Sequence, residues 1–456
     1  MAPQNRLIWL VALTAVPLTV AAALSPAMAT AVIVIVAIVM VIAAGDAAAG
    51  IGIFAGLTVS APRGARLTRD AEGKIELAVI DRRGRALRLR AVLALPPEIS
   101  CPQADIAFRL KPQPAGPSSA YAVWDCRPAR RGRFILETCW VETPSPLGLW
   151  AMRKALPVRV EVSVYPNLGA ERRSVAALFL NRGGYGIHAQ RQIGQGRDFE
   201  KLRAYIPGDS YADIHWKATA KRGRPVTKIY QIERTQEVYV LIDSSRLSGR
   251  AIAVPGVPRG DGLEDLGGTT NMLERFVTAS LVLAMAAQRQ GDLLGLLTFT
   301  TQVDRFLSAR GGRGHFRACR DTLLNVQPSA VTPDFGELFS FVRTRLRRRA
   351  LLIILTNLDD PIIAEQFAHH VQVVSRQHLV LVSSLKNPDV APLFEREAAS
   401  VEEIYAGLGG HLQWRRLREL EWTLRRRGIN FHQLNNETLS AQLISQYVAV
   451  KQRQLL

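Results

Sequence analysis

Residues 196–243 read GRDFEKLRAYIPGDSYADIHWKATAKRGRPVTKIYQIERTQEVYVLID, and this stretch decides how the chain is divided. Its first part is polar, is rich in Arg and Lys, and contains a Pro-Gly-Asp turn at residues 207–209. Its last part runs without a break into VYVLIDSS, residues 238–245, an apolar run that ends in Asp-x-Ser. Near-continuous apolar runs are typical of strands buried on both faces, so this run predicts the first strand of a parallel sheet.

The residues after this strand alternate between strand and helix patterns. Asn271–Gln290 predicts a helix, because Asn271 and Glu274 have the spacing of a capping box and apolar residues recur at helical intervals. Further strands are predicted at 292–300, paired as a hairpin with 303–309, and at 350–358, 378–385 and 430–435. This alternation predicts an α/β domain with a doubly wound parallel sheet, whose ligands bind at the carboxyl ends of the strands.

The preceding residues, about 57–165, contain short apolar runs separated by Pro, Gly and charged residues. Apolar and polar residues alternate within these runs, and turn-forming residues separate them, which predicts an all-β, sandwich-like module. Its expected role is that of a spacer or a partner surface near a membrane. The predicted boundaries are a membrane hairpin at 1–58, the β-sandwich-like module at 59–167, a basic segment at 168–236 and the α/β domain at 237–456.

The N-terminal residues contain two apolar runs, Leu7–Leu24 and Ala31–Ala44, separated by a short turn. Roughly 20 apolar residues cross a bilayer core, so the two runs predict a transmembrane hairpin. The alternative for residues 1–29 is a cleaved signal peptide, because Ala27-Met28-Ala29 resembles a cleavage site. The arginines after the second run predict a cytoplasmic location for the rest of the chain, on a bacterial inner membrane. Asp46 is expected to be hydrated at the membrane interface, with a contact between helices or with a partner as the alternative.

The bulk composition excludes several classes of function. The formal net charge is +19, but no zinc-ligand spacing, helix-turn-helix or basic-aromatic pattern indicates nucleic-acid binding. There is no GxxxxGK[ST], G-x-S-x-G or HExxH motif, so the chain is not expected to be an enzyme of those classes. The four cysteines form no CxxC pair, and the cytoplasm would keep them reduced.

Polar residues at the predicted strand ends form a candidate metal site. Asp243 and Ser245 follow the first strand, Thr332 opens a later helix, and Asn357 and Asp359 follow the strand at 350–358. Carboxylate and hydroxyl oxygens suit Mg²⁺, so Asp243, Ser245, Thr332 and Asp359 are the predicted ligands. The layout resembles the metal-ion-dependent adhesion site of von Willebrand factor A-type domains, in degenerate form because Leu247 takes the place of the third DxSxS residue. The alternative is a strand end that hydrogen-bonds only its own loop.

The basic segment supplies candidate partner-binding residues, namely Arg203, Asp209, Trp216 and Lys217. Three interpretations stay open: a docking loop for an acidic partner, an anion site, or an internal ion network around a buried Trp216. His215 is expected to be structural, since no nucleophile lies beside it.

Four stretches carry a resemblance to a known family: PARRGRFIL (128–136), VETPSPLGLWAMRK (141–154), VYPNL (164–168) and residues 196–243. They resemble the bacterial membrane proteins of the domain of unknown function 58 family. The resemblance implies a membrane hairpin, a β module and a von Willebrand A-like domain, and frequent partnership with MoxR-type AAA+ ATPases. The predicted function is therefore a membrane-anchored protein-binding platform. The alternative is an enzyme acting on an envelope or phosphate-bearing substrate at the strand ends.

Overall fold

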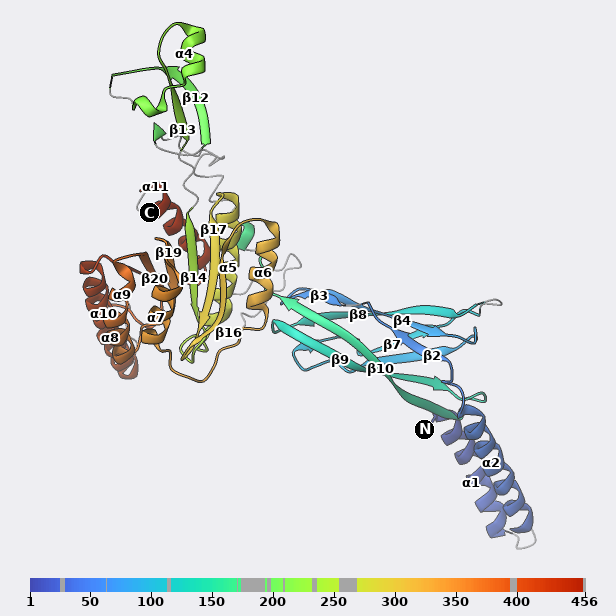
Figure 1. Cartoon of the computed structure of the whole chain (residues 1–456). Coiled ribbons are helices and arrows are strands. Elements are labelled where there is room, and N and C mark those ends of the chain that lie inside the picture. Colours follow the sequence, from blue (N-terminus) through green and yellow to red (C-terminus); the bar gives the residue numbers. More distant parts are fainter. Residues whose placement is uncertain are drawn as a thin grey trace. The chain divides into compact units, whose positions relative to one another are not determined.

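The computed structural model divides the chain into two compact units, Met1–Asn167 and Leu168–Leu456. It describes residues 1–24, 29–62, 64–112, 116–169, 171–173, 193–194, 198–207, 210–231, 236–253, 269–393, 400–453. Figure 1 gives the order of the elements along the chain.

The first unit contains a β module built from two sheets. One sheet has the strand order β1-β10-β9-β5-β7, with β3 paired to β10, and the other has the order β2-β4-β8-β6. The strands are β1 Ala2–Pro3, β2 Leu57–Ser60, β3 Ala65–Thr68, β4 Gly73–Asp81, β5 Arg88–Leu93, β6 Ile99–Ser100, β7 Asp105–Arg109, β8 Ser118–Pro128, β9 Gly132–Pro144 and β10 Trp150–Tyr165. Alternate residues of both sheets enclose one apolar core around the fully buried Trp124. An all-β module is therefore present, as predicted.

Two apolar helices, α1 Asn5–Leu24 and α2 Ala29–Gly50, pack against each other at one end of the β module. Of the described helices, one is long and apolar enough to cross a bilayer, at Thr30–Gly50, and Asn5–Thr19 is apolar but shorter. Large side chains on both helices are exposed, such as Trp9 and Met40. Exposed apolar surface on this scale indicates a lipid or protein environment around the helices.

Asp46, near the end of α2, is bonded to the turn between β9 and β10. Its side chain is buried, at 3 % exposed, and accepts hydrogen bonds from Ser145 Oγ at 2.5 Å, Leu147 N at 2.9 Å and Leu149 N at 3.2 Å. Trp150 Nε1 also donates to the carbonyl oxygen of Ala43 at 2.8 Å. The expectation of a hydrated Asp46 was wrong, because the chain folds the TPSPLG turn back onto the helix end.

The start of the chain meets the same turn. Ala2 and Pro3 pair with Ala151 and Trp150 of β10, and Gln4 N donates to Leu149 O at 2.9 Å. The N-terminal strand and the end of α2 therefore lie at one place on the β module.

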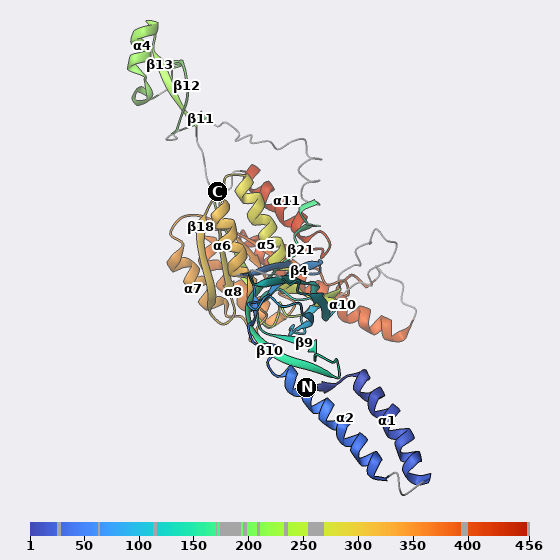
Figure 2. The same ribbon diagram turned by 90° about the vertical axis from the view of Figure 1, so that its right-hand side faces the viewer.

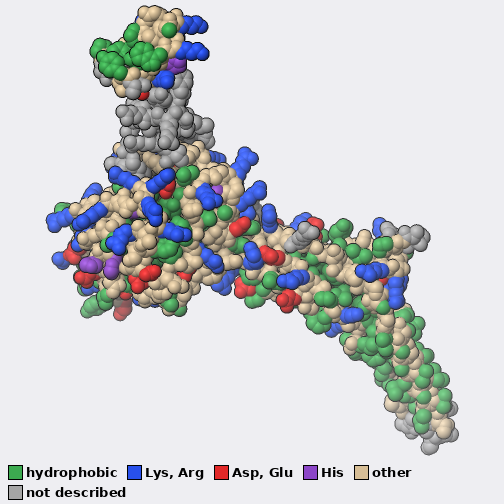
Figure 3. All heavy atoms as spheres, viewed as in Figure 1, with side chains coloured by type: hydrophobic (Ala, Val, Ile, Leu, Met, Phe, Trp, Pro, Cys, Tyr) green, Lys and Arg blue, Asp and Glu red, His purple; other side chains and the backbone are tan. Residues whose placement is uncertain are grey.

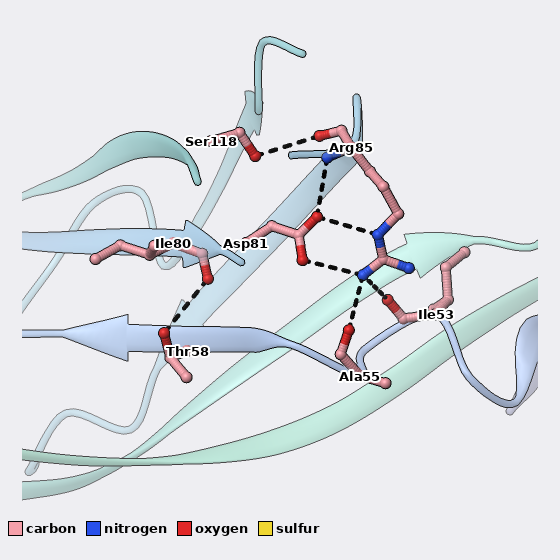
Figure 4. Close-up of polar contacts among 7 residues, drawn as sticks. All are labelled: Ile53, Ala55, Thr58, Ile80, Asp81, Arg85 and Ser118. Carbon is pink, nitrogen blue, oxygen red and sulfur yellow. Dashed lines mark hydrogen bonds and ion pairs between the residues drawn. The ribbon is translucent and has the colours of Figure 1, made fainter. Parts of the chain in front are cut away.

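A buried ion pair fixes the connection that follows α2 (Figure 4). Arg85 pairs with the carboxylate of Asp81, which is fully buried, through Nε at 3.0 Å. The same guanidinium donates to the carbonyl oxygens of Ile53 and Ala55, both at 3.0 Å. Burial alone would raise the pKa of Asp81, but the hydrogen bonds and charge of Arg85 outweigh it and lower this pKa. Arg85 thus satisfies a buried carboxylate and two loop carbonyls together.

The second unit contains the α/β domain. Its sheet has the order β18-β17-β14-β19-β20-β21, with β18 antiparallel to β17 and the other neighbours parallel. The strands are β14 Glu237–Asp243, β17 Leu293–Phe299, β18 Val303–Arg310, β19 Leu351–Leu355, β20 Leu379–Leu385 and β21 Asn430–Leu434, with a separate pair β15 Ala251–Ala253 and β16 Thr269–Asn271. The helices are α5 Met272–Arg289, α6 Arg313–Leu324, α7 Phe335–Arg345, α8 Pro361–His370, α9 Gln372–Ser375, α10 Val401–Arg426 and α11 Leu439–Gln452.

Two apolar clusters lie against this sheet. One joins α5, α6 and α11 to the sheet, and the other joins α7, α8, α9 and α10 to it. The central strand β14 contributes alternate residues to both, Val240 to the first and Leu241 to the second. The predicted capping box is confirmed in part, because Asn271 Oδ1 accepts from Glu274 N at 2.9 Å at the start of α5.

The described residues 193–231 of the basic segment include a small antiparallel sheet and helix α4. The strands β11 Ile193–Gly194 and β12 Asp198–Ala204 pair with β13 Val226–Gln231, and a 3-10 turn at Tyr211–Asp213 leads to α4 Trp216–Arg222. Helix α4 ends at Gly223, whose φ of 64° is the left-handed conformation that favours glycine.

Candidate functional site

Asp243 ends the central strand β14 and is fully buried. Its Oδ1 accepts from Ser245 N at 2.8 Å, and its Oδ2 accepts from Thr356 Oγ1 at 2.6 Å. Burial raises the pKa of Asp243, and these hydrogen bonds oppose the shift. Both carboxylate oxygens therefore already have protein partners.

Ser245 and Thr332 are also engaged by groups of the protein. Ser245 Oγ accepts from Leu247 N at 3.3 Å, and Thr332 Oγ1 accepts from Arg246 Nε at 3.2 Å. Arg246 N donates to Val331 O at 2.9 Å, which ties the two loops together. The structure thus places an arginine side chain on the predicted threonine ligand.

Asp359 is paired with a second arginine. Its Oδ2 lies 3.0 Å from Arg250 and accepts from Asn357 Nδ2 at 3.1 Å. Burial raises the pKa of Asp359, while the Asn357 bond and the positive charge of Arg250 oppose this.

These contacts do not fit a Mg²⁺ site as the side chains stand. A hard cation needs several oxygens that face it, and two guanidinium groups beside the ligand set repel it. Among the described residues there is also no cluster of three or more His, Cys, Asp or Glu side chains suited to a metal. The magnesium site stays a prediction. The positive charge next to Thr332 and Asp359 comes from Arg246 and Arg250.

Sequence reasoning missed Thr356, whose buried hydroxyl is the bond partner of Asp243. The sequence contains little indication of this role, because a Thr directly after the LLIIL run (351–355) is typical of the end of a β-strand. Sequence reasoning also assigned no role to the two arginines.

The basic segment carries an exposed surface of mixed apolar and basic character, which we call the Trp216 surface. Trp216 is 69 % exposed, Tyr211 76 % and Ile206 49 %. The described side chains of this surface are Ile206, Tyr211, Trp216, Lys217, Lys221 and Arg222, and Figure 3 shows apolar and basic side chains gathered on this segment. The interpretation with a buried Trp216 was wrong, since this residue begins α4 and its side chain is exposed.

The other predicted residues of this segment have different positions. Arg203 is half-buried in β12, Lys217 is exposed on α4, and Asp209 lies outside the described residues. His215 is structural as predicted, because its Nδ1 accepts from Ala218 N at 3.0 Å and so caps α4. Of the four predicted partner-binding residues, Trp216 and Lys217 are adjacent in the chain, and both are exposed on α4.

A groove of about 780 Å³ lies along the edge strand β18, beside the start of α6. Its lining includes Arg310, His315 and Arg345, and His315 Nε2 lies 2.6 Å from Leu294 O. None of the predicted ligands lines this groove. Residues 311–316, GGRGHF, form the turn before α6 and the first residues of that helix.

A family model described as "Protein of unknown function DUF58" matches residues 201–251 and 263–395. The match includes the Trp216 surface and most of the strand-end loops, and it confirms the resemblance inferred from the sequence. No curated protein matches the chain.

Three solved structures illustrate the structural similarity. They are an aerotolerance-related membrane protein from Bacteroides fragilis (12 % identity, 46 % of this chain and 97 % of that chain, TM-score 0.28), the conserved hypothetical protein BatB from Bacteroides thetaiotaomicron (15 %, 47 % and 97 %, 0.28) and the SpRpn10 VWA domain (12 %, 46 % and 95 %, 0.26). They assign no activity to this chain.

Proposed function

We propose that this chain, a relative of the DUF58 family, is a membrane-anchored platform that binds a protein partner. The observation that carries the proposal is the Trp216 surface, in which large apolar side chains and lysines are exposed together. Exposed aromatic residues are typical of the centres of protein interfaces, and the rims of such interfaces are polar. The surface lies in residues that the family model matches.

The charge of the surface specifies the chemistry of the partner. Lys217, Lys221 and Arg222 lie on one short helix and are all exposed. Complementary charge accelerates association and selects the partner, so an acidic protein surface fits best. The family resemblance suggests a MoxR-type AAA+ ATPase as that protein, acting in the assembly or maturation of envelope or other complexes.

The arrangement of the first unit supports a two-span anchor. The N-terminal strand and the end of α2 meet at the turn between β9 and β10. Helices that start and end on one side of a bilayer cross it an even number of times, so α1 and α2 together form the anchor. The arginines after α2 favour a cytoplasmic location for the β module, on a bacterial inner membrane.

The enzyme alternative lacks an observation of its own. Asp243 is buried, and both of its oxygens accept hydrogen bonds from the protein. No step of the platform function requires a metal, and the contacts of Arg246 and Arg250 support a strand end without one.

The test is an affinity pull-down of the full-length, detergent-solubilised chain from its native membranes, with Mg²⁺ or EDTA and identification by mass spectrometry. Trp216→Ala and Lys217→Glu are expected to lose a partner that the native chain retains, and EDTA is expected to leave it bound. The matched control is Tyr121→Ala, an exposed aromatic at 70 % on β8 of the other unit. Equal recovery with Trp216→Ala would contradict the proposal, and release by EDTA would restore the magnesium prediction.

A further inference from the structure

Two cysteines lie opposite each other on neighbouring strands of the β module. Strand β6 pairs with β8 in antiparallel register, with Ser100 opposite Arg127, and Ser100 Oγ donates to the carbonyl oxygen of Arg127 at 2.8 Å. One residue further along, the same register sets Cys101 opposite Cys126. Residues directly opposite in an antiparallel pair have Cα atoms about 4.5–5.5 Å apart, within the roughly 4.4–6.8 Å that a disulfide spans.

Both side chains face the same apolar core. Cys126 is 1 % exposed and belongs to the core cluster of the module, while Cys101 is half-buried and packs against that cluster. The loop after Cys101 stays beside β8, because Trp124 Nε1 donates to the carbonyl oxygen of Ala104 at 3.2 Å. Burial raises the pKa of the Cys126 thiol to about 12, and the charge of Cys101 and a hydrogen bond between the two side chains contribute to this rise. The two thiols are therefore neighbours at the rim of the core.

The other two cysteines lie elsewhere. Cys139 is on β9, in the other sheet of the module, and Cys319 is on α6 of the second unit. Figure 2 labels β9 and β4, one strand from each sheet, and β8 pairs with β4. Burial raises the pKa of both thiols to about 11 and about 12, and no second cysteine contributes to either shift. Of the four cysteines of the chain, Cys101 and Cys126 are thus the pair placed to react with each other.

From this juxtaposition we propose that Cys101 and Cys126 are a modification site, which a small disulfide-bearing oxidant converts into an intramolecular disulfide. The half-buried Cys101 reacts first: its thiolate attacks one sulfur of the oxidant, and the other sulfur leaves and takes up a proton. Cys126 then loses its proton and attacks the Cys101 sulfur of the mixed disulfide, and the second half of the oxidant leaves as a thiol. The two cysteines together lose two electrons and two protons, and the oxidant gains both.

The disulfide fastens the edge of a sheet. Strand β6 ends the order β2-β4-β8-β6 and has two residues, so few backbone hydrogen bonds hold it. A bond between Cys101 and Cys126 ties this edge to β8 and closes a loop of about 25 residues. A reducing compartment keeps the pair open, and an accumulation of small disulfides closes it. The site does not rest on the proposed partner, because the Trp216 surface belongs to the other unit.

The first test treats the folded full-length chain in detergent with glutathione disulfide. The reaction is stopped with acid, the free thiols are alkylated after denaturation, and the linked peptides are mapped by mass spectrometry. The expected product is one linkage, between Cys101 and Cys126, which dithiothreitol reverses, while Cys139 and Cys319 are recovered as alkylated thiols. A chain that keeps all four thiols, or a disulfide that includes Cys139 or Cys319, overturns the proposal.

Serine variants test the order of the two steps. Cys126→Ser is expected to stop at the mixed disulfide of Cys101 with glutathione, and Cys101→Ser is expected to leave Cys126 unmodified because it is buried. Cys139→Ser, another buried cysteine of the same module, is the matched control and keeps the linkage. Should Cys126→Ser fail to fold, Cys101→Ser and the native chain still carry the test. Equal modification of Cys126 in Cys101→Ser and of Cys101 in the native chain overturns the assignment of Cys101 as the first to react.

The rate of closure gives a signature that two freely exposed thiols would not show. Because the pKa of Cys126 is about 12, its thiolate fraction rises tenfold for each pH unit throughout the neutral range. The conversion of the mixed disulfide to the closed form is therefore expected to accelerate about tenfold per unit between about pH 7 and 9. A rate that levels off near about pH 8.5, the ordinary pKa of a thiol, overturns the assignment of the buried Cys126 as the second attacking group.

Discussion

Replacing Asp46 by Ala removes the acceptor that holds the turn between β9 and β10 to the end of α2. Each of its three hydrogen bonds involves a carboxylate, and such bonds contribute about 1.5 kcal/mol or more, which gives about 4.5 kcal/mol for the set. Water that reaches the emptied site recovers part of this, so we expect a loss of about 3 kcal/mol in the local opening free energy. Since 1.4 kcal/mol is a factor of ten, opening becomes about 100-fold more frequent.

Hydrogen exchange of the full-length chain in detergent micelles measures this opening. The amides of Leu147 and Leu149 are expected to exchange about 100-fold faster in Asp46→Ala, because both donate to the missing carboxylate. The amides of β4, in the other sheet, should keep their native rates, which separates local opening from global unfolding.

Asp125→Ala is the matched control, since Asp125 is an exposed carboxylate on β8. Asp46→Asn retains one acceptor oxygen and should give an intermediate rate. Native exchange rates at Leu147 and Leu149 in a folded Asp46→Ala chain would refute the assignment of this carboxylate as the tether.

Three further changes test buried groups, each by thermal or urea unfolding in detergent. Arg85→Ala leaves Asp81 buried without its cation and should cost about 3 kcal/mol at pH 7. Because the pKa of Asp81 is lowered, this stabilisation is present above about pH 4 and disappears as pH falls, so an equal deficit at pH 3 would contradict it. Burial raises the pKa of Asp243, so the native carboxylate weakens the fold as pH rises above about 4. Asp243→Asn should therefore keep or raise the melting temperature at pH 7, and a clearly lower melting temperature would show that the two hydrogen bonds to the carboxylate outweigh the cost of its burial. His378 is buried with neither ring nitrogen partnered among the described residues, and burial lowers its pKa. The neutral His378 side chain contributes to the free energy of unfolding above about pH 6.5, and this contribution is lost as pH falls. His378→Leu should therefore reduce the loss of stability between pH 7.5 and 5.5. An unchanged dependence of the unfolding free energy on pH in this range would exclude this role.

Local patterns predicted most of the secondary structure in the second unit. The VYVLID run became β14, the hairpin at 292–309 became β17 and β18, and Asn271 caps α5. These features depend on residues within a few positions of each other, where period and capping chemistry are readable from sequence alone.

The environment of single polar residues was not predictable in the same way. Asp46 and Ser145 lie 99 residues apart in the chain, and Asp243 and Thr356 lie 113 apart. No spacing rule connects residues so far apart, so the sequence alone does not distinguish a buried, hydrogen-bonded carboxylate from an exposed one. Trp216 shows the reverse case, because a large aromatic residue is usually assumed to be buried.

The long strand β10 runs from the end of α2 to the C-terminal end of the first unit. Its 16 residues, at about 3.3 Å each, measure at most about 50 Å from Trp150, which is bonded to α2, to Tyr165 near the end of the first unit. With α2 in the bilayer, this length is the upper limit to the height above the lipid at which the chain leaves the first unit. The potential of charged headgroups is screened within about 8–10 Å in physiological salt, so lipid charge acts on the part of the β module next to α2 and fades along β10 where the strand rises from the lipid.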